Sequence, residues 1–173
     1  MDKKELLVIK IGGNVIDDNA FLSKFLEDLA SIPQPKILVH GGGKLATQLA
    51  AKLGIETQMI DGRRITDSET IKIVTMVYAG LVNKKIVAKL QANKCNAIGL
   101  SGADAQLIQA HKRKHPTIDF GFVGDIDSVN SDFLQKLLED AYTPIIAPIS
   151  MDNAGVLLNT NADTIASTVA LAM

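Results

Sequence analysis

Two short apolar segments of this sequence, residues 6–11 and 37–40, each run directly into consecutive glycines. Those glycines are Gly12, Gly13, Gly41, Gly42 and Gly43. A short, continuous apolar run is typical of a buried parallel strand. Glycine at the end of such a strand lets a ligand approach the backbone without a Cβ in the way. Because open α/β sheets bind ligands at the carboxyl ends of their strands, we expect these two strand ends to share one anion site.

The rest of the chain alternates between strand and helix patterns. Apolar periodicity predicts helices near residues 21–29, 43–53, 67–92, 131–140 and 162–173. Further strands are predicted at 97–100 and 144–149, with hairpins at 57–65 and at 106–111 with 120–126. The long helix is predicted to begin at a capping box formed by Thr66 and Glu69. This order predicts an α/β fold, a three-layer αβα sandwich with an open, mostly parallel sheet.

Composition narrows the functional class. Eighteen basic residues stand against nineteen acidic ones, so the chain lacks the positive charge that nucleic acid or an acidic membrane surface attracts. The longest apolar stretch, residues 73–82, is shorter than the roughly 20 residues that span a bilayer. The single cysteine, Cys95, cannot form an internal disulfide. We therefore expect a cytoplasmic protein with no nucleic-acid partner and no membrane partner.

The second glycine cluster has two alternative explanations, a dinucleotide-binding loop and a turn that needs glycine for its geometry alone. Residues 41–46 satisfy the G-x-G-x-x-A form of the dinucleotide fingerprint, and Asp61 follows near the expected distance. That interpretation leaves Lys10 and the polar residues near position 160 unexplained. Glycines that serve turn geometry alone could account for either cluster singly. A P-loop is excluded, because Lys44 is followed by Leu45 and no glycine stands at the required upstream position.

Charged and amide side chains next to these strands suggest anion chemistry. Lys10 lies within an apolar strand, where an unpaired ammonium is costly to bury, so it faces either water at a sheet edge or a bound anion. We favour the anion. Asn159, Asn161 and Asp163 share one face if their segment is extended, although Asp163 alone is better explained as a helix N-cap. Arg64 could clamp a carboxylate, although a surface arginine is the commoner outcome.

The remaining polar residues offer no general base. His40 is expected to pack or to form hydrogen bonds within its turn, and residues 112–114 are expected to form a solvated basic loop tip. No histidine or cysteine spacing indicates zinc, and no Gly-x-Ser-x-Gly motif indicates a hydrolase. Lysine, arginine, glycine amides and asparagine suit phosphoryl transfer to an acceptor that is already ionised, such as a carboxylate.

Six motifs in chain order carry a resemblance to a known family. They are VIKIGG at 8–13, VHGGG at 39–43, DGRRIT at 61–66, GLVNK at 80–84, GLSGAD at 99–104 and NTNAD at 159–163. Together they closely resemble the acetylglutamate kinase branch of the amino acid kinase family. The resemblance covers essentially the whole chain. It implies an enzyme that phosphorylates the side-chain carboxylate of N-acetyl-L-glutamate with ATP and Mg²⁺, the second step of arginine biosynthesis.

The resemblance also implies roles for individual residues. Lys10 would stabilise the transferring phosphoryl group, and Asp163 would orient the catalytic lysines. The amide donors to the ATP phosphates would be Gly12, Gly13 and Gly41. The residues that hold the amino-acid substrate would be Gly42, Gly43, Arg64 and Asn159. Asn161 would support them, and no residue is implied as a metal ligand.

Domain organisation and assembly follow from the same resemblance. Residues 1–173 would form the N-terminal, acceptor-binding lobe, and a C-terminal nucleotide-binding lobe with a second catalytic lysine would be missing. The helix at 67–92 would contribute to a homodimer. The chain ends inside an apolar helix pattern, so we expect that more protein normally follows and that this chain alone has little activity. The alternatives are a kinase for another N-acyl glutamate and a non-catalytic ligand-binding lobe.

Overall fold

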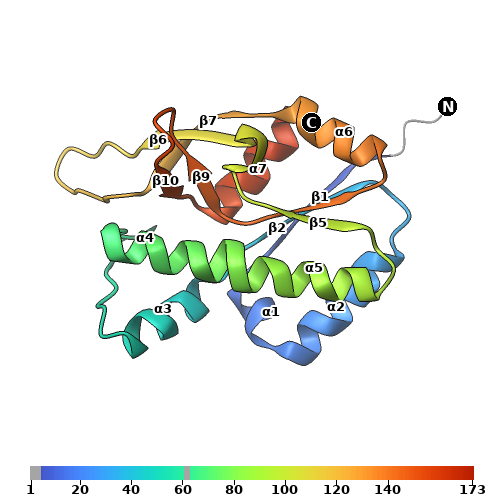
Figure 1. The fold of residues 1–173 in the computed structure, drawn as a ribbon, viewed down its shortest axis with the longest axis horizontal. Helices are drawn as coiled ribbons and strands as arrows, with labels where there is room; N and C mark the ends of the chain where they lie inside the picture. The colour runs from blue at the N-terminus through green and yellow to red at the C-terminus, as the bar shows by residue number, and fades with distance from the viewer. Residues whose placement is uncertain (1–4, 61–62) are drawn as a thin grey trace.

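The computed structural model describes residues 5–60 and 63–173, and its centre is a four-stranded parallel sheet (Figure 1). The strands of this sheet are β1 (Leu7–Ile11), β2 (Lys36–His40), β8 (Thr143–Ile146) and β5 (Ala97–Leu100), in the order β1-β2-β8-β5. All three pairings are parallel. The carboxyl ends of β1 and β2, where the glycines follow, therefore lie side by side at one edge of the sheet.

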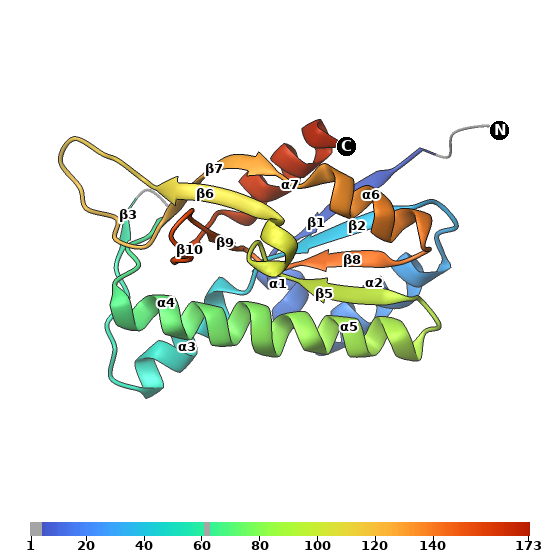
Figure 2. The ribbon, with the colours of Figure 1, turned by 45° about the horizontal axis from the view of Figure 1, so that its top comes forward.

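Helices cover both faces of this sheet (Figure 2). The described helices are α1 (Gly13–Asp17), α2 (Asn19–Ser31), α3 (Gly43–Lys52), α4 (Ser68–Thr75), α5 (Asn83–Ala92), α6 (Ser131–Glu139) and α7 (Ala162–Ala172). Strand β2 shows the layering, because Leu38 packs with residues of α2 and α5, whereas Ile37 and Val39 pack with residues of α6 and α7. The predicted three-layer α/β sandwich is confirmed.

A second sheet packs beside the first. It consists of β10 (Leu157–Asn159), β9 (Ile149–Met151), β6 (Ile108–Lys112) and β7 (Gly124–Val129), in the order β10-β9-β6-β7. Its pairs β10–β9 and β6–β7 are antiparallel, and β6–β9 is parallel. The strand predicted at 144–149 is wrong as one element. It divides into β8 and β9, because Pro148 has no amide hydrogen to continue the ladder and the chain passes there into the second sheet.

A small hairpin precedes the long helix. Strands β3 (Met59–Ile60) and β4 (Arg63–Arg64) pair in antiparallel fashion, as the hairpin prediction requires. The turn predicted at Asp61–Gly62 lies outside the described residues. The hairpin brings Arg64 to the amino-terminal end of α3, where its side chain packs.

The helix predicted at 67–92 is present but differs in two details. Its N-cap is Asp67, whose carboxylate accepts hydrogen bonds from the amides of Glu69 (3.2 Å) and Thr70 (2.7 Å), so the capping box at Thr66 is wrong. Between α4 and α5 the helix takes a π-helical form over Met76–Val82. Such π segments inside α-helices are found frequently at functional sites. None of the described helices is both long enough and apolar enough to cross a bilayer.

Candidate functional site

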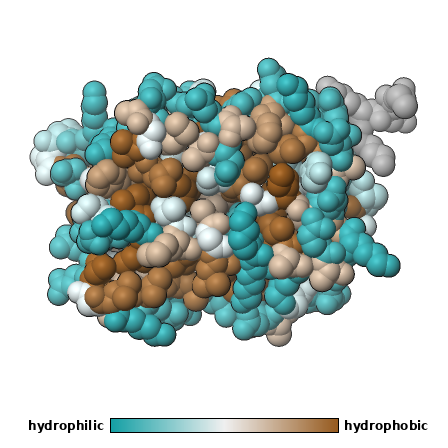
Figure 3. Space-filling view, viewed as in Figure 1, coloured by the Kyte–Doolittle hydropathy of each residue, from teal (hydrophilic) through white to brown (hydrophobic). Residues whose placement is uncertain are grey.

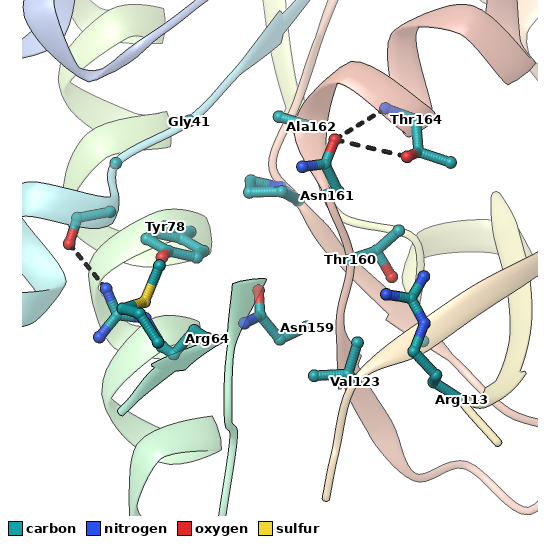
Figure 4. A pocket seen from close by; sticks show the side chains of 15 residues that line it. Gly41, Arg64, Tyr78, Arg113, Val123, Asn159, Thr160, Asn161, Ala162 and Thr164 are labelled. Carbon is teal, nitrogen blue, oxygen red and sulfur yellow. Dashed lines mark hydrogen bonds between the residues drawn. The ribbon is translucent and has the colours of Figure 1, made fainter. Parts of the chain in front are cut away.

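A cavity of about 210 Å³ lies where the carboxyl end of β2 meets the second sheet (Figure 4). The glycines after β2 form one wall, and β10 with the residues that follow it forms the opposite wall. Arg64, Tyr78 and Arg113 extend into its lining from three further elements. Segments far apart in the sequence therefore meet at the end of β2, whereas Lys10, Gly12 and Gly13, which were predicted to share the same site, do not line this cavity.

The two glycine clusters start two helices without side-chain caps. Gly12 is the N-cap of α1 and Gly42 is the N-cap of α3, and neither helix has a capping side chain. The amides of each first turn therefore lack intrahelical partners and are free to bind an anion. Gly42 has a φ of 153°, and a Cβ there would lie 2.9 Å from the Tyr78 ring. Glycine is thus required at Gly42 both by conformation and by close packing.

The amide of Gly41 already has a hydrogen-bond partner within the chain. Its amide donates a 3.0 Å hydrogen bond to the Ile11 carbonyl, which ties the end of β2 to the end of β1. An amide donor to phosphate at Gly41 would have to share or break this bond. Gly41 therefore links the two strand ends, and its predicted role as a phosphate donor stays a prediction, as do those of Gly12 and Gly13.

Lys10 and Asp163 form an ion pair. Lys10 Nζ lies 2.9 Å from Asp163 Oδ1, and both side chains are partly exposed. Within the described sheet β1 is an edge strand, so the edge-strand alternative for Lys10 is partly correct. However, the lysine is held by a carboxylate rather than left in water, and its ammonium lies beside Gly12, where an added Cβ would be 3.5 Å from Nζ. The pair thus fixes a positive charge next to the first glycine cluster.

Arg64 is buried, with 8% of the residue exposed, so the surface-arginine alternative is wrong. Its Nη2 donates to the Gly43 carbonyl (3.0 Å) and to the Thr47 hydroxyl (2.8 Å). Its Nη1 is buried, and none of the described residues accepts a hydrogen bond from it. A buried guanidinium nitrogen without a partner costs free energy, and an anion bound in the cavity would supply the missing acceptor.

Thr66 connects Arg64 to Asn159. The Thr66 hydroxyl donates to the Arg64 carbonyl (3.2 Å) and accepts from the Asn159 side-chain amide (3.0 Å). Backbone bonds add the loop between β6 and β7: Thr66 N donates to the Phe120 carbonyl (3.1 Å), and Asn159 N donates to the Phe122 carbonyl (2.8 Å). This buried link sets how the two predicted substrate-binding side chains lie relative to each other.

The face expected for Asn159, Asn161 and Asp163 does not form. The segment is extended only to Asn159, and the chain then turns into α7. Asn161 is the N-cap of α7 and accepts from the Thr164 amide (3.0 Å), whereas Asp163 lies in the first helical turn. The N-cap interpretation therefore belongs to Asn161 rather than to Asp163, and it leaves the Asp163 carboxylate free to pair with Lys10.

Sequence reasoning missed Tyr78. It is buried within the π segment and lines the cavity beside Gly42. Burial raises the pKa of its hydroxyl, and the positive Arg64 guanidinium beside it partly offsets that effect. In the sequence Tyr78 is one member of a long apolar helix pattern, which does not distinguish it from a core residue or reveal the π segment in which it lies.

Arg113 was also misplaced by sequence reasoning, because it was expected in a solvated loop tip. Its guanidinium instead forms a two-pronged ion pair with Asp125 across the β6–β7 hairpin: Nε lies 3.0 and 3.1 Å from the two carboxylate oxygens, and Nη2 also donates to Oδ1. Only 17% of the side chain is exposed, and the residue lines the cavity. The signal available in the sequence was an arginine twelve residues before an aspartate on a predicted hairpin.

His40 forms hydrogen bonds within its turn, as expected. Its Nδ1 contacts the Gly41 carbonyl (2.8 Å), and its Nε2 contacts the Asn83 side-chain amide (3.2 Å). Asn83 Nδ2 also donates to the Ile145 carbonyl (2.9 Å). Burial lowers the pKa of His40 to about 4, so the ring is neutral at pH 7 and does not serve as a base that titrates near neutrality.

The described residues contain no group of three histidine, cysteine, aspartate or glutamate side chains placed to hold a metal ion. The charged groups at the glycine-rich strand ends include the Lys10–Asp163 pair and a pair of Lys44 with Asp17 at 3.7 Å, and those that line the cavity are the two arginines. Such an arrangement can bind an anionic ligand and neutralise charge that is transferred between two anions.

Comparisons with known proteins show the family of the chain. The sequence profile of the amino acid kinase family matches residues 5–173. Acetylglutamate kinase of Cytophaga hutchinsonii is 57% identical over 171 residues, which are 98% of this chain and 65% of that protein. Acetylglutamate kinase of Phocaeicola vulgatus is 53% identical over 99% of this chain and 66% of its own length. The chain thus spans slightly less than two thirds of these curated relatives.

Solved structures share the fold. The crystal structure of smu.665 from Streptococcus mutans matches with a TM-score of 0.83 at 29% identity, over 96% of this chain and 68% of that one. N-acetylglutamate synthase from Neisseria gonorrhoeae, complexed with coenzyme A and N-acetyl-glutamate, also reaches a TM-score of 0.83, at 20% identity over 39% of its length. At that identity the second match supports the fold alone.

Proposed function

The chain belongs to the amino acid kinase family, and from this membership we propose that it is the acceptor-binding lobe of a kinase that uses N-acetyl-L-glutamate. The reaction would be the second step of arginine biosynthesis, in the cytoplasm, with ATP as phosphoryl donor. The observation that carries the proposal is the buried Arg64 Nη1, which has no acceptor among the described residues and lies at a cavity bounded by glycine backbone. The high identity to acetylglutamate kinases supports the choice of acceptor.

The acceptor would be held through its α-carboxylate. Arg64 would donate to that carboxylate, and the Asn159 side chain would lie against it from the opposite wall (Figure 4). Gly42 and Gly43 would let the main-chain part of the bound acceptor approach the protein backbone, since neither residue carries a Cβ. Asn161 would support this wall by fixing the start of α7. This leaves the side-chain carboxylate of the ligand directed toward the strand ends.

The transfer step would need no general base. A carboxylate oxygen of the acceptor attacks the γ-phosphorus of ATP, the bond from that phosphorus to the β,γ-bridging oxygen breaks, and ADP leaves with the electron pair. The products are an acyl phosphate and ADP. Lys10, oriented by Asp163, would neutralise charge on the phosphoryl group. The free amides at Gly12 and Gly13 would bind phosphate oxygens.

The nucleotide would bring Mg²⁺ with it and would contact a second lobe. We assign residues 1–173 to the acceptor lobe, and we expect another part of the kinase to bind the nucleoside and to supply a second lysine. For this reason the proposal concerns binding by this chain, and its tests measure binding rather than turnover.

We also propose that two copies associate through the long helix. Met76 and Leu81 are exposed on its π segment, and Leu53 is exposed after the neighbouring α3. Figure 3 shows a hydrophobic area on this face, over the long helix and α3. A second copy of the chain would remove these side chains from water. Sedimentation should show a dimer that Met76→Glu with Leu81→Glu converts to a monomer, and a monomeric parent chain would refute this assembly.

The acceptor assignment is tested by titration calorimetry of the folded chain. N-acetyl-L-glutamate should bind, and unacylated L-glutamate should bind much more weakly, because its ammonium group would enter a site that already holds Arg64. Equal binding of the two, or binding of neither by a sample shown to be folded by circular dichroism, would reject the proposed acceptor. The titration needs no ATP, because the residues that line the proposed acceptor cavity all belong to this chain.

A further inference from the structure

The acceptor cavity contains a second guanidinium that the proposed chemistry does not use. Arg64 and Arg113 both line it, and they come from opposite sides of the site (Figure 4). No aspartate or glutamate is among the described residues of its lining. Since the α-carboxylate is assigned to Arg64 and the reacting carboxylate to the region of Lys10, Arg113 is left facing the remaining part of an N-acyl glutamate, which is the acyl group.

The ion pair with Asp125 leaves one edge of Arg113 available. Asp125 accepts from Nε and from Nη2, so its carboxylate occupies the edge of the guanidinium that these two nitrogens form. Nη1 has no described hydrogen-bond partner and is not among the buried polar atoms that lack one, so it is open to a ligand or to solvent in the cavity. Arg113 directly follows β6, and in Figure 4 its guanidinium reaches toward Thr160. Asp125 thus orients the group without using all of its donors.

Arg113 has structural contacts, namely the pair with Asp125 and a position 5.8 Å from the centroid of the Phe120 ring, but neither partner lines the cavity as Arg113 does. The same hairpin already carries a cross-strand pair, His111 with Asp127, whose side chains are 54% and 48% exposed. The Arg113 side chain is 17% exposed and lies inside the cavity instead. A hairpin can be stabilised by an exposed pair, whereas a guanidinium placed in a ligand cavity meets whatever the ligand presents there.

We propose that the N-acyl group of the acceptor ends in a carboxylate and that Arg113 is the residue that selects it. The proposal rests on the proposed function for the kinase reaction and for the glutamate part of the acceptor, and it replaces the acetyl group by an acyl group that ends in a carboxylate. A carboxylate accepting from Arg113 Nη1 makes a charge-assisted hydrogen bond, which a methyl group cannot make. The acceptor would then carry three carboxylates, opposite Arg64, Arg113 and the region of Lys10.

The test is titration calorimetry of the chain with three ligands that share the glutamate part. They are N-acetyl-L-glutamate, N-(3-carboxypropanoyl)-L-glutamate and its terminal carboxamide, which matches the second ligand in size but is neutral. The carboxylated ligand should bind about tenfold or more tightly than the carboxamide. In Arg113→Gln this preference should disappear, and in Asp125→Asn it should weaken because the guanidinium loses its orientation.

Lys114→Gln is the matched control, because it removes one positive charge at the next residue, which is exposed and does not line the cavity. It should keep the full preference. If the carboxylate and the carboxamide bind equally, or if Arg113→Gln keeps the preference, the inference is overturned while binding of N-acetyl-L-glutamate still supports the proposed function. If none of the three ligands binds to folded chain, the proposed function itself fails. Arg113→Lys, which retains a charge, shows whether a loss in Arg113→Gln reflects misfolding.

Discussion

The side-chain amide of Asn159 donates a 3.0 Å hydrogen bond to the hydroxyl of Thr66, across 93 residues of sequence. The same hydroxyl donates to the Arg64 carbonyl, so a single buried oxygen sets the spacing of the two side chains assigned to the ligand carboxylate. Both hydrogen bonds are buried or partly buried, and their loss would leave polar groups without partners. Thr66 is therefore a positioning residue that need not touch the ligand.

Thr66→Val keeps the shape of this side chain and removes its hydroxyl. We expect the affinity for N-acyl glutamate to fall about tenfold, with the unfolding free energy lowered by about 1–3 kcal/mol. Thr66→Ser keeps the hydroxyl and should restore most of the affinity. Calorimetry with urea denaturation on both variants separates the two effects. A valine variant that is destabilised yet binds like the parent would show that Thr66 has only a structural role.

Arg64→Ala tests the assigned carboxylate clamp. Removing the guanidinium should reduce the affinity for N-acetyl-L-glutamate roughly ten- to hundredfold, because charge-assisted hydrogen bonds are lost. The circular dichroism spectrum should remain that of the parent chain. Lys24→Ala removes the same charge from an exposed pair on α2 and should bind normally. Unchanged affinity in Arg64→Ala would argue strongly against the acceptor assignment.

His40 predicts a pH dependence of stability. Its folded pKa is about 4, against 6.5 for a free histidine, because the ring is buried. As the pH falls below 6.5, the unfolded chain binds a proton that the folded chain does not bind until about pH 4. The unfolding free energy should therefore decrease across this interval, by roughly 3 kcal/mol in total from this one group.

Urea denaturation between pH 8 and pH 4 measures this dependence. His40→Gln cannot titrate, so its unfolding free energy should vary less with pH over the interval from 6.5 to 4, even if it is lower overall. Parallel curves for parent and variant would mean that His40 does not cause the pH dependence. Carboxylates such as Asp67, whose pKa is lowered by the amides that it caps, lose their contribution only at lower pH.

Asp67 gives a prediction about the start of the long helix. Asp67→Ala removes the cap and should lower the unfolding free energy by about 0.5–2 kcal/mol, whereas Asp67→Asn keeps an acceptor oxygen and should cost less. Thermal or urea denaturation of both variants at pH 7 provides the comparison. Equal stability of Asp67→Ala and the parent would show that this N-cap contributes nothing.

The sequence predicts those parts of the fold that depend on local patterns. The strands that end in glycine follow from continuous apolar runs, and the helices follow from apolar periodicity, so the layered fold could be derived before the structure. The division between β8 and β9 could not be predicted from the sequence. Pro148 is compatible with a turn of the chain there, but it does not determine which sheet the next strand joins. Strand assignment of that kind depends on tertiary pairing.

Site prediction failed where a side chain's role depends on a distant partner. By contrast, Lys10 and Asp163 could be predicted to lie near each other, because both adjoin strand-end motifs. Arg113 was assigned to solvent, since its neighbours in the sequence are basic and its partner Asp125 lies on the opposite strand. Tyr78 was missed because an aromatic residue in an apolar helix pattern is indistinguishable from a core residue until the helix geometry is known.

The π segment has a consequence for how this helix can change in evolution. Leu81 is exposed and Val82 is buried, so the buried face has moved forward by one position relative to an α-helix that continues from Val74. The segment therefore holds one additional residue, absorbed as a widened turn. Deleting one residue within 79–81 would let a straight α-helix keep both flanking faces in place. Such a deletion would leave the fold intact but would change the position of Tyr78 in the cavity wall. Ligand specificity can therefore vary at this turn independently of the stability of the fold.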